Sequence, residues 1–197
     1  GYTHNADIIC AAPTLLLQYA RQLGLKKPTP TIEYYIANRK SERLRIHALL
    51  ELEDTPKEHK KVKQIISGLF NGQYITPRWD SSIMYLLDNR VLLINRLKCD
   101  TFLINLRKEI AEMWKAIRKA LNLKGRLNAK KKSDIYRKLE EQVKDTIKRY
   151  MNKNNIRVFT EHDGWRTDRF YEICDLKRYV REHTSYEINI DCENFGQ

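Results

Sequence analysis

The β-prone segments of this sequence lie only near its two ends, and the long middle is typical of helix. Residues 1–12 predict one extended segment, and residues 156–159 and 186–192 predict two strands, the last with alternating polar and apolar side chains. Residues 57–152 are strongly charged and carry apolar side chains at helical spacing. A sheet that contains all three segments requires both ends of the chain to meet. We expect an α+β fold in which both chain ends form a small antiparallel sheet around a large, mostly helical insertion.

This pattern divides the chain into three parts. They are residues 1–54, the helical insertion at 55–153, and the return to the sheet at 154–197. In the first part, apolar periodicity predicts helices over about 13–24 and 31–53. The second of these helices has six candidate inward positions: Ile32, Tyr35, Ile36, Leu44, His47 and Leu50.

The insertion and the return contain further predicted elements. The insertion predicts four helices, over about 56–72, 81–96, 100–122 and 133–152. A basic loop, 124–132, joins the last two of them. The return predicts, after its first strand, a tight turn at 162–164 and a helix over about 168–181. A helical lobe inserted into a smaller α+β body is the expected arrangement.

The charge of the chain indicates a polyanionic partner. Its 197 residues include 37 Lys and Arg against 25 Asp and Glu, which gives a formal net charge of +12. Basic proteins bind nucleic acid non-specifically by neutralising phosphates and releasing counterions. The alternative is a basic surface that serves only solubility. The charge favours nucleic acid as the partner and leaves its kind open.

The cysteines, histidines and apolar runs exclude several classes of protein. The four cysteines, Cys10, Cys99, Cys174 and Cys192, form no CxxC pair, and the five histidines lack the Cys/His spacing of a zinc site. We interpret the thiols as reduced and the protein as intracellular, in the cytoplasm or nucleus of a host cell. No run approaches the ~18 apolar residues that a membrane span requires, and no signal peptide is recognisable. We therefore expect no membrane association.

A polar stripe marks the predicted helix over 56–72. Four polar residues recur at a spacing of four and so share one face: His59, Lys63, Ser67 and Asn71. Such a face suits contact with a triphosphate, and the alternative is an ordinary solvated face. Gly68, inside this helix, costs up to about 1 kcal/mol relative to Ala, which predicts that another group packs closely against it.

Two aspartates far apart in the sequence are candidates for metal binding. Asp7 lies in the first extended segment, and Asp163 lies in the turn at 162–164. If the two ends pair, both carboxylates lie on neighbouring strands and repel each other unless divalent cations bind between them. Two Mg²⁺ ions ~3.5–4 Å apart can activate an attacking hydroxyl and stabilise a leaving phosphate, with few protein ligands. The alternative for either Asp is an ordinary turn or capping residue.

These three elements occur in the order found in a known superfamily. Asp7, then the helix segment 63–72, then His162-Asp163-Gly164 resemble the three motifs of family A DNA polymerases and phage-type single-subunit RNA polymerases. In that family a palm strand carries the first metal-binding Asp, a fingers helix has a Lys eight residues before an aromatic-Gly pair, and a His-Asp turn carries the second metal ligand. The resemblance covers nearly the whole chain and implies that residues 1–54 and 154–197 form the palm and 55–153 the fingers.

The resemblance implies roles for the residues that match. Asp7 and Asp163 would bind two Mg²⁺ ions, or Mn²⁺ in their place, and the Ile8 carbonyl would complete the coordination. Lys63 would contact the incoming triphosphate and assist proton transfer to pyrophosphate. The expected partners are therefore a primer-template and nucleoside triphosphates.

Further residues match the nucleotide and primer contacts of the family. The residues on the nucleotide side would be His59, Lys63, Ser67, Asn71, Gly72 and Ala12, with His59 as a basic phosphate contact. His162 would support the primer terminus, beside Gly164. Residues 13–16, with Tyr35, Asn38 and Arg39, are also similar to divergent viral and protist members, so a viral or mobile-element origin is expected.

The departures from the family pattern bear on the sugar of the substrate. Asn71 and Ser67 stand where the family has aromatic residues, which weakens stacking on the incoming nucleotide. Ala12 stands where the DNA polymerases carry a bulky Glu that excludes the ribose 2′-hydroxyl, and Gly164 stands where they have another acid. A small side chain leaves room for a 2′-hydroxyl. These departures favour ribonucleotide use or weak sugar discrimination.

Several functions remain open at this point. The first is a template-directed nucleotidyltransferase, a family A type DNA polymerase or, alternatively, an RNA polymerase or primase of the same superfamily. The second is a non-catalytic, basic nucleic-acid-binding subunit, and the third is a basic scaffold of helices. The family's thumb normally precedes the first motif and is not recognisable here. Either the chain is a fragment, which its start at Gly1 rather than Met favours, or a partner subunit supplies the thumb.

Overall fold

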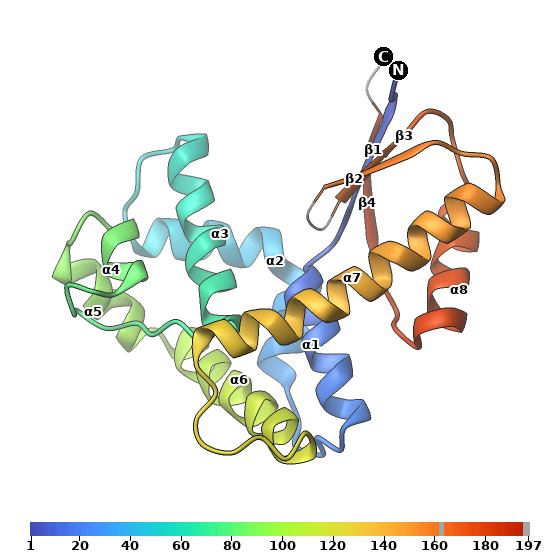
Figure 1. The fold of residues 1–197 in the computed structure, drawn as a ribbon. Coiled ribbons are helices and arrows are strands. Elements are labelled where there is room, and N and C mark those ends of the chain that lie inside the picture. Colours follow the sequence, from blue (N-terminus) through green and yellow to red (C-terminus); the bar gives the residue numbers. More distant parts are fainter. Residues whose placement is uncertain (162–163, 195–197) are drawn as a thin grey trace. The chain divides into compact units, whose positions relative to one another are not determined.

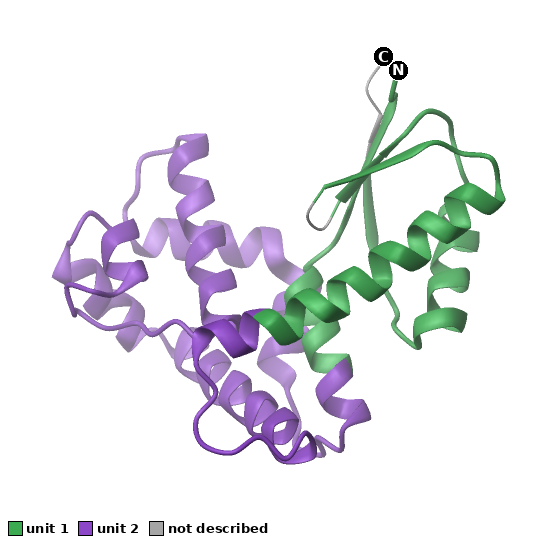
Figure 2. Cartoon of the chain, viewed as in Figure 1, with its two compact units in different colours: residues 1–18, 134–197 green, residues 19–133 purple. Residues whose placement is uncertain are grey.

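The computed structural model describes residues 1–161 and 164–194 (Figure 1). The chain divides into two compact units (Figure 2). The first unit comprises residues 1–18 and 134–197, and the second comprises residues 19–133. The chain therefore leaves the first unit once and returns to it. The division into palm and fingers stays a prediction.

The first unit is built on a four-stranded antiparallel sheet. Its strands, in the order β2-β3-β1-β4, are β1 (His4–Ile8), β2 (Val158–Glu161), β3 (Gly164–Thr167) and β4 (Ile190–Asn194). β1 pairs along both edges with strands from the other end of the chain, so that Ala6 faces Trp165 on β3 and Cys192 on β4. The expectation that both chain ends form a small antiparallel sheet is confirmed.

The two faces of this sheet differ in burial. Ala6 and Ile8 are buried, whereas Asp7 between them is exposed, because alternate residues of a strand point to opposite faces. Trp165 is buried on the same face as Ala6, and its Nε1 donates a hydrogen bond of 2.9 Å to the Tyr171 hydroxyl. Burial of the indole with its N–H satisfied stabilises β3 in register with β1. This register decides which residues share the exposed face.

Strand β3 was not predicted, and its presence shifts the helix that follows. The helix expected from about Asp168 begins only at Ile173, as α8 (Ile173–Thr184). Asp168 instead accepts hydrogen bonds of 3.0 Å from the backbone N–H and from Nε of Arg157. These bonds join the residue before β2 to the residue after β3, so Asp168 stabilises the paired strands rather than the start of a helix.

The last strand is shorter than the predicted span of 186–192. Tyr186 and Ile188 keep the predicted alternation and are buried, but regular pairing begins only at Ile190. The backbone at Glu187 pairs with a side chain instead. The Gln18 amide donates to the Glu187 carbonyl at 2.7 Å and accepts from its N–H at 2.8 Å.

The regular elements of the second unit are helices. Its helices are α2 (Pro30–Leu49), α3 (Pro56–Phe70), α4 (Ser82–Leu86), α5 (Val91–Cys99) and α6 (Thr101–Ala120). α1 (Ala11–Gln22) and α7 (Ala129–Lys153) each have residues in both units. Trp114 on α6 donates a buried hydrogen bond of 2.8 Å from Nε1 to the Phe70 carbonyl at the end of α3. This bond fixes α6 against the end of α3.

Helix α2 is kinked at Asn38, and one of its predicted inward positions is exposed. Asn38 has φ of −124° and ψ of 27°, outside the helical range. Before the kink, Ile32 and Tyr35 are buried as predicted; after it, Ile46 is buried and Leu44 is 58% exposed. The prediction that Leu44 points inward is wrong, because it lies two residues from Ile46, on the opposite face of the helix. The buried residues follow one face on both sides of the kink: Ile32, Tyr35, Glu42, Ile46 and Leu50. His47 and Leu50 are buried as predicted, and Ile36 is half-buried.

Two other helix predictions are corrected. The single helix expected over 81–96 is two, α4 and α5, because Asp88 and Asn89 adopt left-handed backbone angles, with φ of 53° and 58°. α7 begins at Ala129 rather than near 133, since the Asn128 side chain accepts a hydrogen bond of 2.9 Å from the Lys131 N–H. The basic residues of the expected loop therefore lie partly in the first turn of α7.

The other helices predicted in the first 122 residues are present. α1, α3 and α6 lie within about 13–24, 56–72 and 100–122, apart from a residue or two at their ends. The side chains of Thr55 and Asp100 accept hydrogen bonds from the first turns of α3 and α6. Within the described part of the chain, no helix combines the length and apolar character needed to span a bilayer.

Asp100 provides a test of the packing in the second unit. Its carboxylate accepts hydrogen bonds of 2.7 and 2.9 Å from the Arg45 guanidinium and one of 3.0 Å from the Leu103 N–H. Burial alone would raise the pKa of Asp100, but the hydrogen bonds from Arg45 and from the backbone hold that pKa below its usual value. The ionised form is therefore favoured in the folded state.

We expect Asp100→Asn to lower the free energy of unfolding by about 1–3 kcal/mol at pH 7, because Asn preserves the cap but loses the charged pair with Arg45. Since the folded pKa is lowered, the difference should be complete above about pH 4 and disappear as the pH falls further. Urea denaturation of both proteins from pH 7 to about pH 2.5 measures it. A difference that does not change with pH would contradict this account.

Candidate metal-binding face and nucleotide pocket

The exposed face of the sheet carries Asp7, the first predicted metal ligand. The strand register places Asp7 directly opposite Gly164 on β3 and Asp191 on β4. Directly opposite residues of antiparallel strands share a face, with Cβ atoms about 4.5–5.5 Å apart. Asp7 and Asp191 are both exposed. Two carboxylates therefore lie on neighbouring strands of one solvent-facing surface.

Gly164 leaves the space that the Asp7 carboxylate occupies. A Cβ atom at Gly164 would collide with Asp7 Oδ1 and would lie 3.0 Å from the Ala6 carbonyl oxygen. The Asp side chain is short, so it could move away only by turning to another rotamer. Glycine is favoured here because it leaves room for the Asp7 carboxylate. Backbone conformation is not the reason, since the backbone of Gly164 is not left-handed. Its predicted contact with primer or template stays a prediction.

Two predicted site residues, His162 and Asp163, lie outside the described residues. Asp163 is adjacent in sequence to Gly164, the residue that faces Asp7. Ile8, whose carbonyl was expected to bind metal, ends β1 with its side chain buried. Across residues 1–161 and 164–194, no three His, Cys, Asp or Glu side chains are grouped so as to hold a metal ion. A metal ion on this face would therefore need ligands in addition to the side chains of the described residues.

Asp191 was not predicted as a site residue. The alternating pattern of 186–192 places it on a polar face, but its position opposite Asp7 depends on strand register, which the sequence does not give. The charges of Asp191 and Asp7 also act on Cys192. Burial first, and then these two carboxylates, raise the pKa of the Cys192 thiol, although a hydrogen bond with Tyr171 opposes the effect. The pair therefore creates a negative potential at this part of the sheet.

The second predicted site lies on α3, where Lys63 is exposed. Lys63 makes no ion pair or hydrogen bond through its side chain with any described residue. Lys61, two residues earlier, is buried and pairs with Glu58 and Asp88, each at 2.9 Å. Of these two lysines, Lys63 is the one that can reach an external anion.

His59, the predicted phosphate contact, has partners within its own unit. Its Nε2 lies 2.6 Å from Asp54 Oδ1, and its ring stacks on His47 with centroids 4.1 Å apart. The hydrogen bond and the charge of His59 lower the pKa of Asp54. An incoming phosphate would therefore compete with Asp54 for His59.

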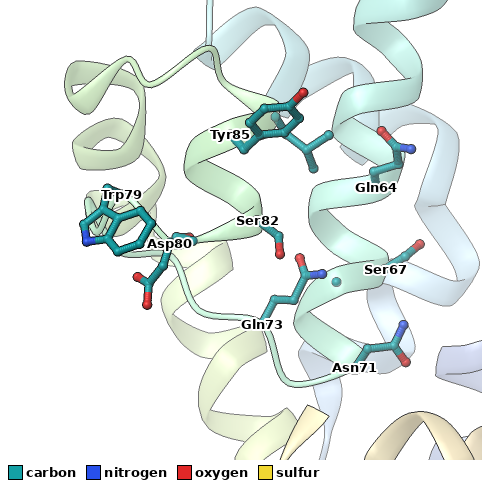
Figure 3. A pocket seen from close by; sticks show the side chains of 11 residues that line it. Gln64, Ser67, Asn71, Gln73, Trp79, Asp80, Ser82 and Tyr85 are labelled. Atoms are coloured by element: carbon teal, nitrogen blue, oxygen red, sulfur yellow. The ribbon is translucent and has the colours of Figure 1, made fainter. Parts of the chain in front are cut away.

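A cavity of about 550 Å³ opens beside the polar stripe of α3 (Figure 3). Ser67 and Asn71 of the stripe line it, together with Gln64 on the same helix. The other wall comes from residues within 79–86, where the side chains of Trp79 and Tyr85 are 90% and 77% exposed. Hydroxyl and amide groups thus face a cavity that two aromatic rings border, a combination that suits a planar polar ligand.

Two buried amide oxygens at this cavity have no hydrogen-bond donor among the described residues: Asn71 Oδ1 and Gln73 Oε1. Buried polar atoms in proteins are nearly always hydrogen-bonded, so these two oxygens lack the partner that such atoms usually have. The Gln73 side chain covers Gly68, where an added Cβ would collide with its amide. The prediction that a group packs closely on Gly68 is confirmed.

The two remaining predicted residues lie elsewhere. Gly72 follows the end of α3 with φ of +87°, and the bonds Gly72 N–H to Leu69 and Gln73 N–H to Gly68 close the helix. Gly72 borders a different cavity, beside Lys132. Ala12, in the first turn of α1, is half-buried and belongs to the first unit.

Gln73, Trp79 and Tyr85 carry no strong signal in the sequence. Trp79 precedes a predicted helix start, and Tyr85 lies inside it, where an aromatic residue is usually part of the core. Only their exposure beside a cavity distinguishes them from core residues.

Comparison with known proteins adds no assignment to this geometry. No protein-family model matches the chain, and no curated protein matches it.

The contact between Gly68 and Gln73 can be tested by the effect of Gly68→Ala on the free energy of unfolding, with and without the Gln73 side chain. Gly68→Ala should raise the free energy of unfolding by less than the usual gain of Ala over Gly inside a helix, because the new methyl group must displace the Gln73 amide. In a Gln73→Ala background the same change should raise it by up to about 1 kcal/mol, because Ala is favoured over Gly inside a helix. Urea denaturation of the four proteins measures the cycle. An equal change in both backgrounds would show that Gln73 does not cover Gly68.

Proposed function

We propose that this protein is a template-directed nucleotidyltransferase that adds nucleotides to a 3′-hydroxyl by two-metal-ion phosphoryl transfer. The observation that carries the proposal is the register of the central strand. Asp7 on β1 faces Gly164, the residue that directly follows Asp163. This pairing supports the expectation, drawn from the resemblance to family A polymerases, that Asp7 and Asp163 act together.

The exposed face of the sheet would hold the metal ions. Asp7 and Asp163 are the proposed ligands for two Mg²⁺ ions, and Asp191 is a third candidate because it lies opposite Asp7. Divalent cations would offset the repulsion between these carboxylates. The ions would lower the pKa of the attacking 3′-hydroxyl and stabilise the charge on the leaving pyrophosphate. Gly164 would act by leaving room for the Asp7 carboxylate.

The second unit would bind the incoming nucleotide. Lys63, exposed and without a side-chain partner among the described residues, would contact the triphosphate. The cavity beside Ser67 and Asn71 would receive a nucleobase, whose N–H groups could satisfy the two unpaired amide oxygens. Trp79 could stack on such a base or on one next to it, because stacking on aromatic side chains stabilises bound bases of any sequence.

Three side chains bear on which sugar the incoming nucleotide carries and on whether the product is DNA or RNA. Ala12 is half-buried and small, and Ser67 and Asn71 are polar where the family has aromatic rings. We propose that these residues allow ribonucleotides, so that the product is DNA with weak sugar discrimination or RNA. The net charge of +12 favours a nucleic-acid template, and a thumb from another domain or subunit would hold the duplex.

Primer extension tests the proposal. A labelled primer-template with Mg²⁺ should be extended in a template-dependent way, and comparison of deoxynucleotides with ribonucleotides identifies the substrate. Asp7→Asn and Asp163→Asn should each reduce the rate at least about 10²-fold through loss of metal binding. Lys63→Met should reduce it about 10²-fold through loss of a charged contact and of proton transfer. Matched controls are Asp145→Asn and Lys60→Met, which change exposed residues of α7 and α3.

The outcomes separate the candidate functions. Extension that is lost in the three site variants and kept in the two controls supports the proposal. Extension that survives Asp163→Asn unchanged contradicts the assigned metal site. Salt-sensitive nucleic-acid binding without extension, in the presence of every nucleotide and of Mn²⁺, would favour the alternative of a non-catalytic binding subunit, for which the exposed Trp79 and Tyr85 would supply stacking.

A further inference from the structure

A second cavity, of about 370 Å³, lies in the second unit beside the end of α3. Its walls are mainly apolar and come from α3 and α6, with Leu69, Ile104, Ile110 and Trp114 among them. The lining also includes three cationic residues, Arg107, Lys108 and Lys132. No carboxylate belongs to the lining among the described residues. An apolar cavity with only positive charge on it is suited to an organic anion.

Lys132 is the cation most closely built into this cavity. Its Nζ lies 5.4 Å from the centroid of the Trp114 ring, and its side chain crosses the space above Gly72. A Cβ atom at Gly72 would lie 2.8 Å from both Cδ and Nζ of Lys132, so a glycine is needed there for the lysine as well as for the left-handed backbone. The fold therefore holds this ammonium at the cavity.

The charge of Lys132 is not compensated within the described residues. No ion pair or side-chain hydrogen bond joins Lys132, Arg107 or Lys108 to any of them. Burial, and then the nearby charge of Arg126, lower the pKa of Lys132. Arg126 itself lies over the Tyr74 ring, 5.1 Å from its centroid, and donates a hydrogen bond to the Tyr74 hydroxyl. A half-buried cation next to a second cation gains most from an anionic ligand.

We propose that this cavity binds the phosphate group of a nucleotide at Lys132 and Arg107, with the nucleoside against the apolar wall of Leu69, Ile104 and Ile110. The volume lies in the range of about 300–1,000 Å³ that is usual for small-molecule sites, and a bare phosphate would leave the apolar wall uncovered. Arg and Lys bind phosphate through charge-assisted hydrogen bonds. The ligand could be a free mononucleotide or the phosphorylated 5′ end of a nucleic-acid strand.

This site does not depend on the proposed polymerase activity. Asp7, Lys63, Ser67 and Asn71 do not line it, and it lies within the second unit alone. Gly72, which the resemblance placed at the incoming nucleotide, borders this cavity instead of the one beside Ser67. A nucleotide here would therefore be bound in addition to any substrate.

Methyl NMR of the full chain, with ¹³C-labelled isoleucine, tests the proposal. Adenosine 5′-monophosphate should shift the Ile104 and Ile110 signals and should bind about tenfold or more tightly than adenosine or inorganic phosphate. Lys132→Met keeps most of the side-chain length and should weaken binding about tenfold or more, whereas Lys132→Arg should retain it. Lys131→Met, a change of the exposed neighbouring residue, should leave the affinity unchanged.

Two further arms identify the source of the phosphate. If a 5′-phosphorylated oligonucleotide shifts the same methyl signals and its 5′-hydroxyl counterpart does not, the ligand is the end of a strand. If only the mononucleotide shifts them, the ligand is a free nucleotide. The proposal is overturned if none of these ligands moves the Ile104 and Ile110 signals, or if Lys132→Met, with unchanged thermal unfolding, binds adenosine 5′-monophosphate as tightly as the wild type.

Discussion

The pairing of β1 along both of its edges is the constraint on which the first unit depends. β1 has only five residues, and its partners β3 and β4 come from the far end of the chain. The entropy lost in closing so long a loop must be offset by burial of the strand's apolar face. Ala6, Ile8 and Trp165 supply that burial. Because side chains alternate along a strand, the same register that buries these residues leaves Asp7 on the exposed face.

Close packing around Asp7 links this register to the proposed chemistry. Gly164 has no side chain where the Asp7 carboxylate lies, and Asp191 occupies the opposite position on β4. A one-residue shift of either pairing would move these groups to different faces. The stability of the sheet and the geometry of the acidic face are therefore set by the same backbone hydrogen bonds. The second unit has its own fixed points, among them the Trp114 bond to Phe70 and the Arg45–Asp100 pair.

Local signals in the sequence were sufficient for much of the fold. Pro56 after the capping Thr55, and the capping Asp100, fixed the starts of two long helices, and apolar periodicity predicted their buried faces. The features that were missed depend on contacts between distant residues. β3 is recognisable only through its pairing with β1, and the break between α4 and α5 depends on left-handed angles at Asp88 and Asn89. The kink at Asn38 likewise has no signal in the periodicity of α2.

The candidate sites also combine features that local sequence predicts with features that depend on contacts between distant residues. The polar stripe on α3 was readable from a spacing of four, and its residues Ser67 and Asn71 do line a cavity. The opposite wall with Trp79, the partner of His59, and the cavity at Lys132 required the folded chain. Asp191 required the strand register, since an Asp in an alternating strand has many structural uses.

The most direct test of the central claim is paramagnetic broadening of backbone NMR signals by Mn²⁺. The claim is that the carboxylates gathered by the β1 register bind divalent metal ions. Mn²⁺ should broaden the amide signals around Asp7, Gly164 and Asp191 first, Mg²⁺ should compete, and Asp7→Asn should remove the effect while the sheet remains folded. Broadening that is absent from these strands, or unchanged in Asp7→Asn, would contradict the account.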